Sequence, residues 1–254
     1  MHITRIHAFK DNYIWLLENG QGQAVVVDPG DAQPVLDYLK ANHLNLLAIL
    51  ITHHHADHTG GIPKLAQHYP CQVYGPAKET IHGVTQRLQH HEQVTLGHNF
   101  PTFTVLDCPG HTLGHIAFYS APYLFCGDTL FAGGCGRMFE GTPAQFSSSL
   151  HQFMQLPSDT RVYCAHEYTE ANLAFAAAVE PGNTDIQTRR EHVQALRAKN
   201  QATVPSLLEV ELATNPFLRT QIAEVRQAAE EHSGQHLAST ELVFGALRQW
   251  KDSF

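Results

Sequence analysis

The stretch THHHADH (residues 52–58) constrains this chain more than any other, because it places four histidines and one aspartate within six consecutive positions. It directly follows the apolar run LLAILI (residues 46–51), which predicts a buried β-strand. Each buried imidazole brings a donor and an acceptor that need partners, so a core without a metal would leave several of them unsatisfied. The stretch therefore predicts a metal site at the end of a strand.

The spacing within this cluster divides its members into two sets. In an extended chain His53, His55 and Asp57 project to the same side, because successive side chains alternate. His58 adjoins Asp57 and must point in a different direction. One segment can thus supply His53 and His55 to a first ion, and Asp57 and His58 to a second.

Further metal-ligand candidates stand where other predicted strands end. His111 follows CPG, Asp128 follows YLFCG, and His166 follows RVYCA. Loops that cross the end of a sheet can gather such groups in one place. This mixture of nitrogen and carboxylate ligands suits zinc, iron or manganese, without choosing among them. We expect His53, His55, His111 and Asp128 around the first ion, and Asp57, His58, His166 and the shared Asp128 around the second.

Two cysteines are rival ligands, and one aspartate has two interpretations. Cys126 and Cys164 each precede a candidate ligand by two residues, so on a strand they would share its direction. We expect them instead to be small apolar core residues. Asp28, in VVVDPG, either orients a ligand imidazole or belongs to a simple turn.

The order of the predicted elements indicates an α+β protein. Nine short runs rich in β-branched or aromatic residues occupy the first two-thirds of the chain, and helical patterns separate some of them. One helical pattern starts with a capping box at Thr142 and Gln145. From about Tyr168 the strand signals give way to alanine-rich, charged segments. We expect two packed sheets with outer helices over residues 1–167, and a helical domain over residues 168–254.

Charge and cysteine usage limit the classes of partner. The formal net charge of -8 argues against a nucleic-acid-binding surface. Five cysteines without CxxC spacing suggest reduced thiols in the cytoplasm. The N-terminus lacks a signal-peptide pattern, and no run approaches the roughly 18 apolar residues needed to cross a bilayer. We therefore expect a cytoplasmic monomer that binds neither nucleic acid nor membrane.

Four motifs, THHHADHTGG, PGHTLGH, CGDTLF and CAHEYT, together resemble the metallo-β-lactamase superfamily. The segments GCGRMFEGTP, NPFLR and LRQWKDSF make the chain similar to the glyoxalase II (hydroxyacylglutathione hydrolase) family over essentially its whole length. The resemblance implies an αββα sandwich followed by a helical C-terminal domain. It also implies two divalent ions, zinc first with iron or manganese as alternatives, in the two ligand sets above and bridged by Asp128.

The resemblance further implies an activity. Family members hydrolyse S-D-lactoylglutathione and other S-2-hydroxyacylglutathiones to the hydroxy acid and glutathione, the second step of methylglyoxal detoxification. A hydroxide that bridges the two ions would attack the thioester carbonyl, with Asp57 and Asp128 as catalytic ligands. The substrate contacts that carry over to this sequence are Arg137, Phe139, Tyr168, Arg248 and Lys251.

Three of these substrate contacts have more than one interpretation or depart from the family pattern. Phe139 stands where some family members have tyrosine, so this chain lacks the hydroxyl that a tyrosine would offer to glutathione. Arg248 and Lys251, three residues apart, would lie on one helix face, where they could bind the glycine carboxylate of glutathione. Cations in a last helical turn also complement the helix dipole, which is the alternative interpretation.

Other functions make different demands on the same residues. A lactonase of the superfamily shares the ligand pattern, but it has no need of the GCGR segment and the basic C-terminal pair, which fit an anionic tripeptide. A mononuclear iron oxygenase would use two histidines and one carboxylate, leaving Asp57, His58 and His166 without a role. A non-enzymatic metal protein would fill the coordination positions that mixed, shared ligands leave open.

Overall fold

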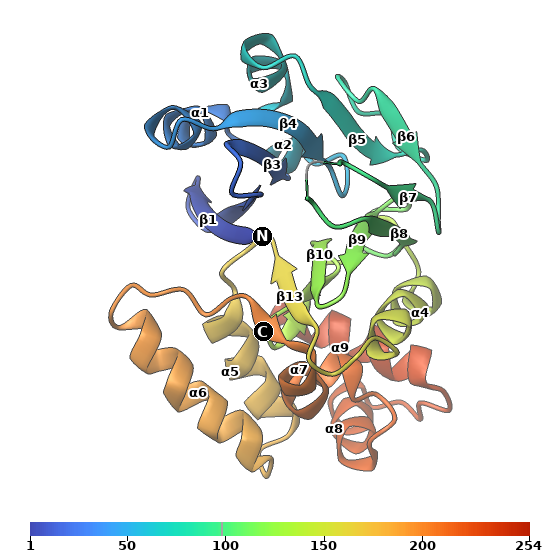
Figure 1. Cartoon of the computed structure of the whole chain (residues 1–254). Helices are drawn as coiled ribbons and strands as arrows, with labels where there is room; N and C mark the ends of the chain where they lie inside the picture. The colour runs from blue at the N-terminus through green and yellow to red at the C-terminus, as the bar shows by residue number, and fades with distance from the viewer. Residues whose placement is uncertain (98) are drawn as a thin grey trace.

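The computed structural model describes residues 1–97 and 99–254, and its centre is a pair of facing β-sheets. Helices cover the outer surface of each sheet, α1 to α3 on one side and α4 to α9 on the other (Figure 1). This arrangement confirms the expected α+β sandwich. The first sheet contains, in spatial order, β1 (His2–Ala8), β2 (Asn12–Glu18), β3 (Gln23–Val27), β4 (Asn45–Leu50), β5 (Gln72–Pro76) and β6 (Gln86–Leu88).

Strand β2 is apolar on both faces because both faces are covered. Trp15 and Leu17 belong to the core that the two sheets share, while Ile14 and Leu16 belong to a second core beneath α1 (Ala32–Ala41) and α3 (Ile62–His68). The alternation follows from the two-residue period of a strand. The first sheet is thereby fixed between the second sheet and its own helices.

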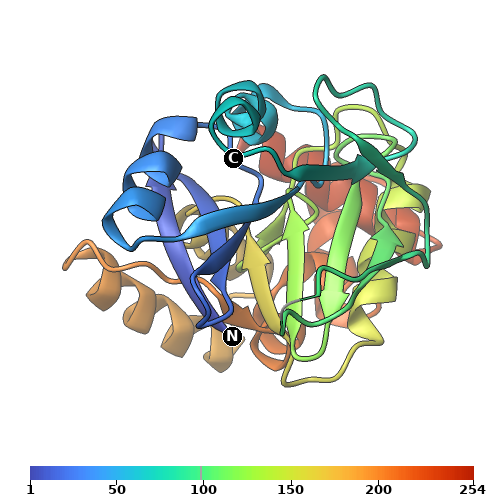
Figure 2. The same cartoon turned by 45° about the horizontal axis from the view of Figure 1, so that its top comes forward.

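The second sheet continues the sandwich with strands from the middle of the chain. Its strands lie side by side in front of the red C-terminal helices in Figure 2. Each of the nine runs expected to be extended contains a strand, and the sequence signals missed short ones such as β11 (Leu130–Phe131) and β12 (Gly134–Cys135). In spatial order the sheet contains β14 (Ser206–Leu207), β13 (Arg161–Cys164), β10 (Tyr123–Gly127), β9 (Ile116–Ser120), β8 (Phe103–Asp107) and β7 (Gln93–Val94).

The last third of the chain is helical, apart from one short strand. Strand β14 pairs antiparallel with β13 and so extends the second sheet. Helix α4, between the sheet strands, begins with the expected capping box of Thr142 and Gln145. Within residues 1–97 and 99–254, no helix has the length and apolar character to span a bilayer. The helices on this side are α4 (Pro143–Met154), α5 (Thr169–Val179), α6 (Thr184–Arg197), α7 (Leu208–Thr214), the 3-10 helix η1 (Pro216–Leu218), α8 (Ala223–Ser233) and α9 (Thr240–Ser253).

Candidate metal centre and substrate cleft

Loops at the ends of β4, β8, β10 and β13 bring the seven expected metal ligands together. Nδ1 of His55 lies 3.1 Å from Nε2 of His53 and 3.0 Å from Nε2 of His111. Three groups have donor atoms that all lie within 4.8 Å of one another: His53, His55 and His111; His53, His58 and Asp128; and Asp57, His58 and His166. These groups overlap as two adjacent sites would.

The expectation that the chain stays extended through Asp57 is wrong. Helix α2 (Ala56–Thr59) starts directly after His55, so Asp57 lies in a helical turn. The turn still delivers its carboxylate to the second group, since Oδ2 of Asp57 lies 3.6 Å from Nε2 of His58 and 3.5 Å from Nε2 of His166. The helical turn therefore places Asp57 in a different group of possible ligands from that of His53 and His55.

The outer nitrogens of two ligand imidazoles face groups that only accept hydrogen bonds. Nδ1 of His111 donates to the backbone carbonyl of Arg137 at 2.7 Å. Nδ1 of His166 donates to Oδ1 of Asp11 at 2.9 Å. Because Nδ1 carries the hydrogen in each ring, the neutral imidazole keeps its lone pair on Nε2, which points toward the other ligands.

Asp28 orients two further imidazoles, so it does more than form a turn. The Thr52 hydroxyl donates to Oδ2 of Asp28 at 2.7 Å, which leaves its lone pairs free to accept from Nδ1 of His53 at 3.0 Å. Nδ1 of His58 faces the same Asp28 oxygen at 3.1 Å. Four Nε2 lone pairs thus converge on one space, where they cannot bond to one another. The arrangement fits bound cations.

The Asp128 carboxylate lies between the ligand groups. Its Oδ1 is 3.4 Å from Nε2 of His58 and 3.4 Å from Nε2 of His166, and its Oδ2 is 3.4 Å from Nε2 of His111. Oδ1 is buried and has no hydrogen-bond partner among the described residues. Burial raises the pKa of this carboxyl, but the positive charge that His58 and His166 carry when they are protonated outweighs burial and holds the pKa well below its usual value. An ionised, unpartnered oxygen in this position suits a shared metal ligand.

Two residues that hold the ligands were not foreseen from the sequence. Asp11 bonds His166, and Nδ2 of Asn12 donates to Oδ2 of Asp57 at 3.0 Å. Asp11 directly precedes the buried strand β2, whose first residue, Asn12, forms an isolated β-bridge with His166. A polar pair at a strand boundary is the same signal that pointed to the ligands themselves. Here the polar pair lies at the start of a strand, whereas the ligands were sought where strands end.

The two rival cysteines belong to the core. Both are fully buried, and among the described residues neither joins a metal-ligating group. Sγ of Cys126 points to the Leu130 carbonyl at 3.2 Å, and Sγ of Cys164 to the His166 carbonyl at 3.6 Å. Burial raises the pKa of both thiols, that of Cys164 to about 12, so they stay protonated.

A cleft of about 500 Å³ opens over the metal ligands. Two aromatic rings form its walls next to the ligands: Tyr168 stacks on His166 with ring centres 4.8 Å apart, and Phe139 contacts His111 at 5.3 Å. Phe139 is 60% exposed and Tyr168 38% exposed, so both can meet a ligand. The cleft is lined by all five expected substrate contacts, Arg137, Phe139, Tyr168, Arg248 and Lys251.

The two cations of α9 line the same cleft in different ways. Arg248 is buried, and its Nη1 donates to the carbonyls of Cys135 at 2.9 Å and Gly136 at 3.3 Å. The Lys251 ammonium is half-buried and has one backbone acceptor, the Ala171 carbonyl at 3.3 Å. Arg248 therefore stabilises the backbone of the cleft wall, while the Lys251 ammonium still has N–H groups that can donate to a ligand.

Glycine is required at one position of the GCGR segment. A Cβ atom on Gly136 would lie 1.9 Å from the Asp128 carbonyl oxygen and 3.1 Å from Nδ1 of His111. The backbone of this segment therefore packs directly against two metal ligands. It also carries the Arg137 carbonyl that orients His111.

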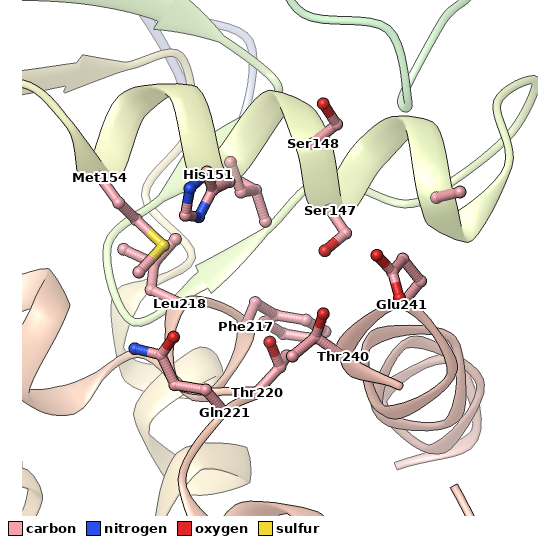
Figure 3. A pocket seen from close by; sticks show the side chains of 12 residues that line it. Ser147, Ser148, His151, Met154, Phe217, Leu218, Thr220, Gln221, Thr240 and Glu241 are labelled. Atoms are coloured by element: carbon pink, nitrogen blue, oxygen red, sulfur yellow. The ribbon is translucent and has the colours of Figure 1, made fainter. Parts of the chain in front are cut away.

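A second cleft, of about 340 Å³, has no cluster of possible metal ligands among the described residues. It lies where α4 faces η1 and the start of α9, and Figure 3 shows Ser147, His151 and Met154 of α4 on one side of it. Its lining contains one histidine, His151, and one carboxylate, Glu241. No group among the described residues that could hold a metal includes either of them.

Comparison with known proteins agrees with this architecture. The metallo-beta-lactamase superfamily model matches residues 9–166, and the model described as the hydroxyacylglutathione hydrolase C-terminus matches residues 167–254. Hydroxyacylglutathione hydrolase of Idiomarina loihiensis is 50% identical over 254 residues, covering 100% of both chains. The Pseudomonas fluorescens enzyme of the same name is 52% identical, also over 100% of both chains. The chain belongs to the hydroxyacylglutathione hydrolase family.

Solved structures show how widely the family's fold is shared. ETHE1 from Myxococcus xanthus superposes with a TM-score of 0.68 at 23% identity, over 100% of this chain and 99% of that one. The BLEG-1 B3 metallo-beta-lactamase superposes with a TM-score of 0.66 at 24% identity, over 85% of this chain and 99% of that one. TTHA1623, solved in a di-iron-bound form, superposes with a TM-score of 0.60 at 26% identity, over 86% of this chain and 100% of that one.

Proposed function

We propose that this member of the hydroxyacylglutathione hydrolase family hydrolyses the thioester bond of S-2-hydroxyacylglutathiones, including S-D-lactoylglutathione. The products are the hydroxy acid, D-lactate in that case, and glutathione. The observation that carries the proposal is one cleft that joins the ligand cluster to Arg137, Arg248 and Lys251. A lactone would not need these cations, whereas glutathione carries two carboxylates.

In this proposal the seven clustered side chains hold two divalent ions. Zinc is the expected metal, and iron is an alternative that the di-iron form of TTHA1623 supports; manganese suits the same ligands. When bound, such ions polarise a carbonyl oxygen and lower the pKa of water. The first ion would have His53, His55, His111 and Asp128, and the second Asp57, His58, His166 and Asp128.

The chain's own residues bind and orient the substrate. Asp57 and Asp128 line the cleft floor, where the reacting carbonyl would lie, and Asn12 holds the Asp57 carboxylate in place. Lys251 and Arg137 bind the carboxylates of glutathione, and Phe139 and Tyr168 pack along its thioester end. The leaving thiolate has a conjugate-acid pKa near ~8.5, so its departure needs no protein acid.

The proposal also assigns a setting and a division of labour. Five cysteines without disulfides fit a reducing compartment, and we place the protein in the cytoplasm as a monomer in methylglyoxal detoxification. Residues 1–167 would hold the metals, and residues 168–254 would supply most of the glutathione contacts.

The direct test is hydrolysis of S-D-lactoylglutathione, followed as loss of thioester absorbance. We expect turnover by metal-loaded protein, none after chelation, and recovery when zinc is returned. A panel of lactones measured in parallel is the control for substrate class. Metal-loaded protein that opens lactones and leaves every glutathione thioester intact would replace this proposal with a lactonase.

A further inference from the structure

His115, the second histidine of PGHTLGH, is fully buried and belongs to neither ligand set. It nevertheless touches ligands from two different loops. Its Nε2 accepts a hydrogen bond from the backbone N–H of Asp128 at 3.2 Å. Its ring stacks on that of His53, with ring centres 4.6 Å apart and planes 18° from parallel. One side chain therefore contacts the ring of a ligand of the first group and the backbone of Asp128, whose carboxylate lies between the groups.

The surroundings of His115 fix its tautomer. Because the Asp128 N–H donates to Nε2, the ring hydrogen must lie on Nδ1. Nδ1 faces Oγ1 of Thr129 and Sγ of Cys108, each at 3.3 Å. The Thr129 hydroxyl donates to Cys108, which leaves its lone pairs for His115.

The backbone around His115 is tightly packed. Gly127, which delivers Asp128, has φ +49°, and a Cβ there would lie 2.3 Å from Oγ1 of Thr52 and 2.9 Å from Nε2 of His115. The Ile116 N–H donates to the Thr52 carbonyl at 2.9 Å. The ends of β4, β9 and β10 thus meet at this imidazole, so its position is transmitted to His53 and Asp128.

We propose that His115 is a positioning residue of the metal centre, which acts mainly by setting the backbone of Asp128 through Nε2 and to a smaller extent by stacking on the ring of His53. It touches neither the metals nor the substrate. Its effect is to keep the two ligands in the geometry that the ions require, so its loss lowers metal affinity. The proposal rests on the metal centre of the proposed function, but not on the identity of the substrate.

Two variants that differ by one methylene separate this role from bulk packing. The carboxamide of His115→Gln reaches the position of Nε2 and can accept from Asp128 N–H, whereas that of His115→Asn stops near Nδ1. We expect His115→Asn to weaken zinc binding about 10- to 100-fold, measured by chelator competition, and to shift the visible absorption of the cobalt-loaded protein. His115→Gln should stay within about threefold of the native affinity, well inside that range.

The matched control is His151→Asn, in the separate cleft of Figure 3, which should leave affinity and spectrum unchanged. Folded His115→Asn protein with native affinity and spectrum would overturn the proposal, and so would equal losses in the Asn and Gln variants. If His115→Asn does not fold, the Thr129→Val variant is measured instead. It removes one partner of His115 Nδ1 and should weaken zinc binding severalfold. Native zinc affinity in Thr129→Val would overturn the proposal. Zinc affinity and the cobalt spectrum are measured without substrate. If the His115→Asn and His115→Gln variants differ in zinc affinity while the native protein does not hydrolyse thioesters, only the proposed function is rejected.

Discussion

The two walls of the substrate cleft are built on different principles. On the metal side the outer nitrogens of four candidate ligands, His53, His58, His111 and His166, all face a polar partner, and these residues are at most 4% exposed. On the substrate side Phe139 is 60% exposed. The difference teaches that the ligand geometry is fixed before anything binds, while the contacts for a flexible tripeptide adjust to it. Changes on the metal side should therefore cost more than changes on the substrate side.

The largest effect is expected at the shared ligand. Asp128→Ala removes the carboxylate that lies 3.4 Å from three ligand imidazoles, so the variant should lose at least one of the two ions and more than about a hundredfold of kcat/KM. Elemental analysis and thioester hydrolysis check both effects. Asp159→Ala, at an exposed carboxylate, is the control. Full activity and metal content in Asp128→Ala would remove the bridging assignment.

A smaller loss is expected one step away from the ions. Asp11→Asn keeps the shape of the side chain but weakens the bond that holds Nδ1 of His166, so metal affinity should fall about tenfold. KM should change little, because Asp11 does not line the cleft. Chelator competition and steady-state kinetics separate the two quantities. A change confined to KM would show that Asp11 acts on the substrate side instead.

The metal side is also the part that the sequence predicts best. His53, His55, His111, Asp128 and His166 each follow an apolar strand, and strand ends in one sandwich must meet. A ligand can thus be assigned from its place along the chain, without knowledge of its neighbours. Five of the seven candidate ligands can be assigned in this way, whereas Asp57 and His58 reach the cluster from the helical turn α2.

The supporting contacts could not be predicted in this way. His115 acts through the backbone N–H of Asp128, and Asp11 reaches His166 across 155 positions in the chain. A polar residue at a strand boundary can be noticed in the sequence, but its partner cannot, because the contact exists only after both sheets have packed. The same holds for Arg248, whose helical position gives no sign that its guanidinium bonds to the Cys135 and Gly136 carbonyls. Burial and backbone acceptors are properties of the fold.

The two cations of α9 should respond differently to truncation. Lys251→Ala should raise KM for S-D-lactoylglutathione about tenfold with little change in kcat, since it removes an ammonium that can reach a carboxylate. Arg248→Ala should lower the melting temperature as well, because two carbonyls lose their donor. Thermal unfolding alongside kinetics tests the contrast. Equal KM effects without a stability difference would show that both residues serve the ligand alone.

The smallest effect is expected at Phe139, where the substrate side is most exposed. Phe139→Tyr adds a hydroxyl to a ring that already contacts His55 and His111, so the ring should keep its place. One new hydrogen bond to the substrate in a solvated cleft is worth about 0.5 kcal/mol, which corresponds to a two- to threefold lower KM. Metal affinity should not change, because the substitution leaves the ring contacts with His55 and His111 in place. Phe139→Leu is the matched control, since it removes the aromatic contacts and should raise KM instead. An altered metal content in Phe139→Tyr would mean that this wall, too, helps to set the ligand geometry, and the contrast between the two walls would then fail at its most exposed residue.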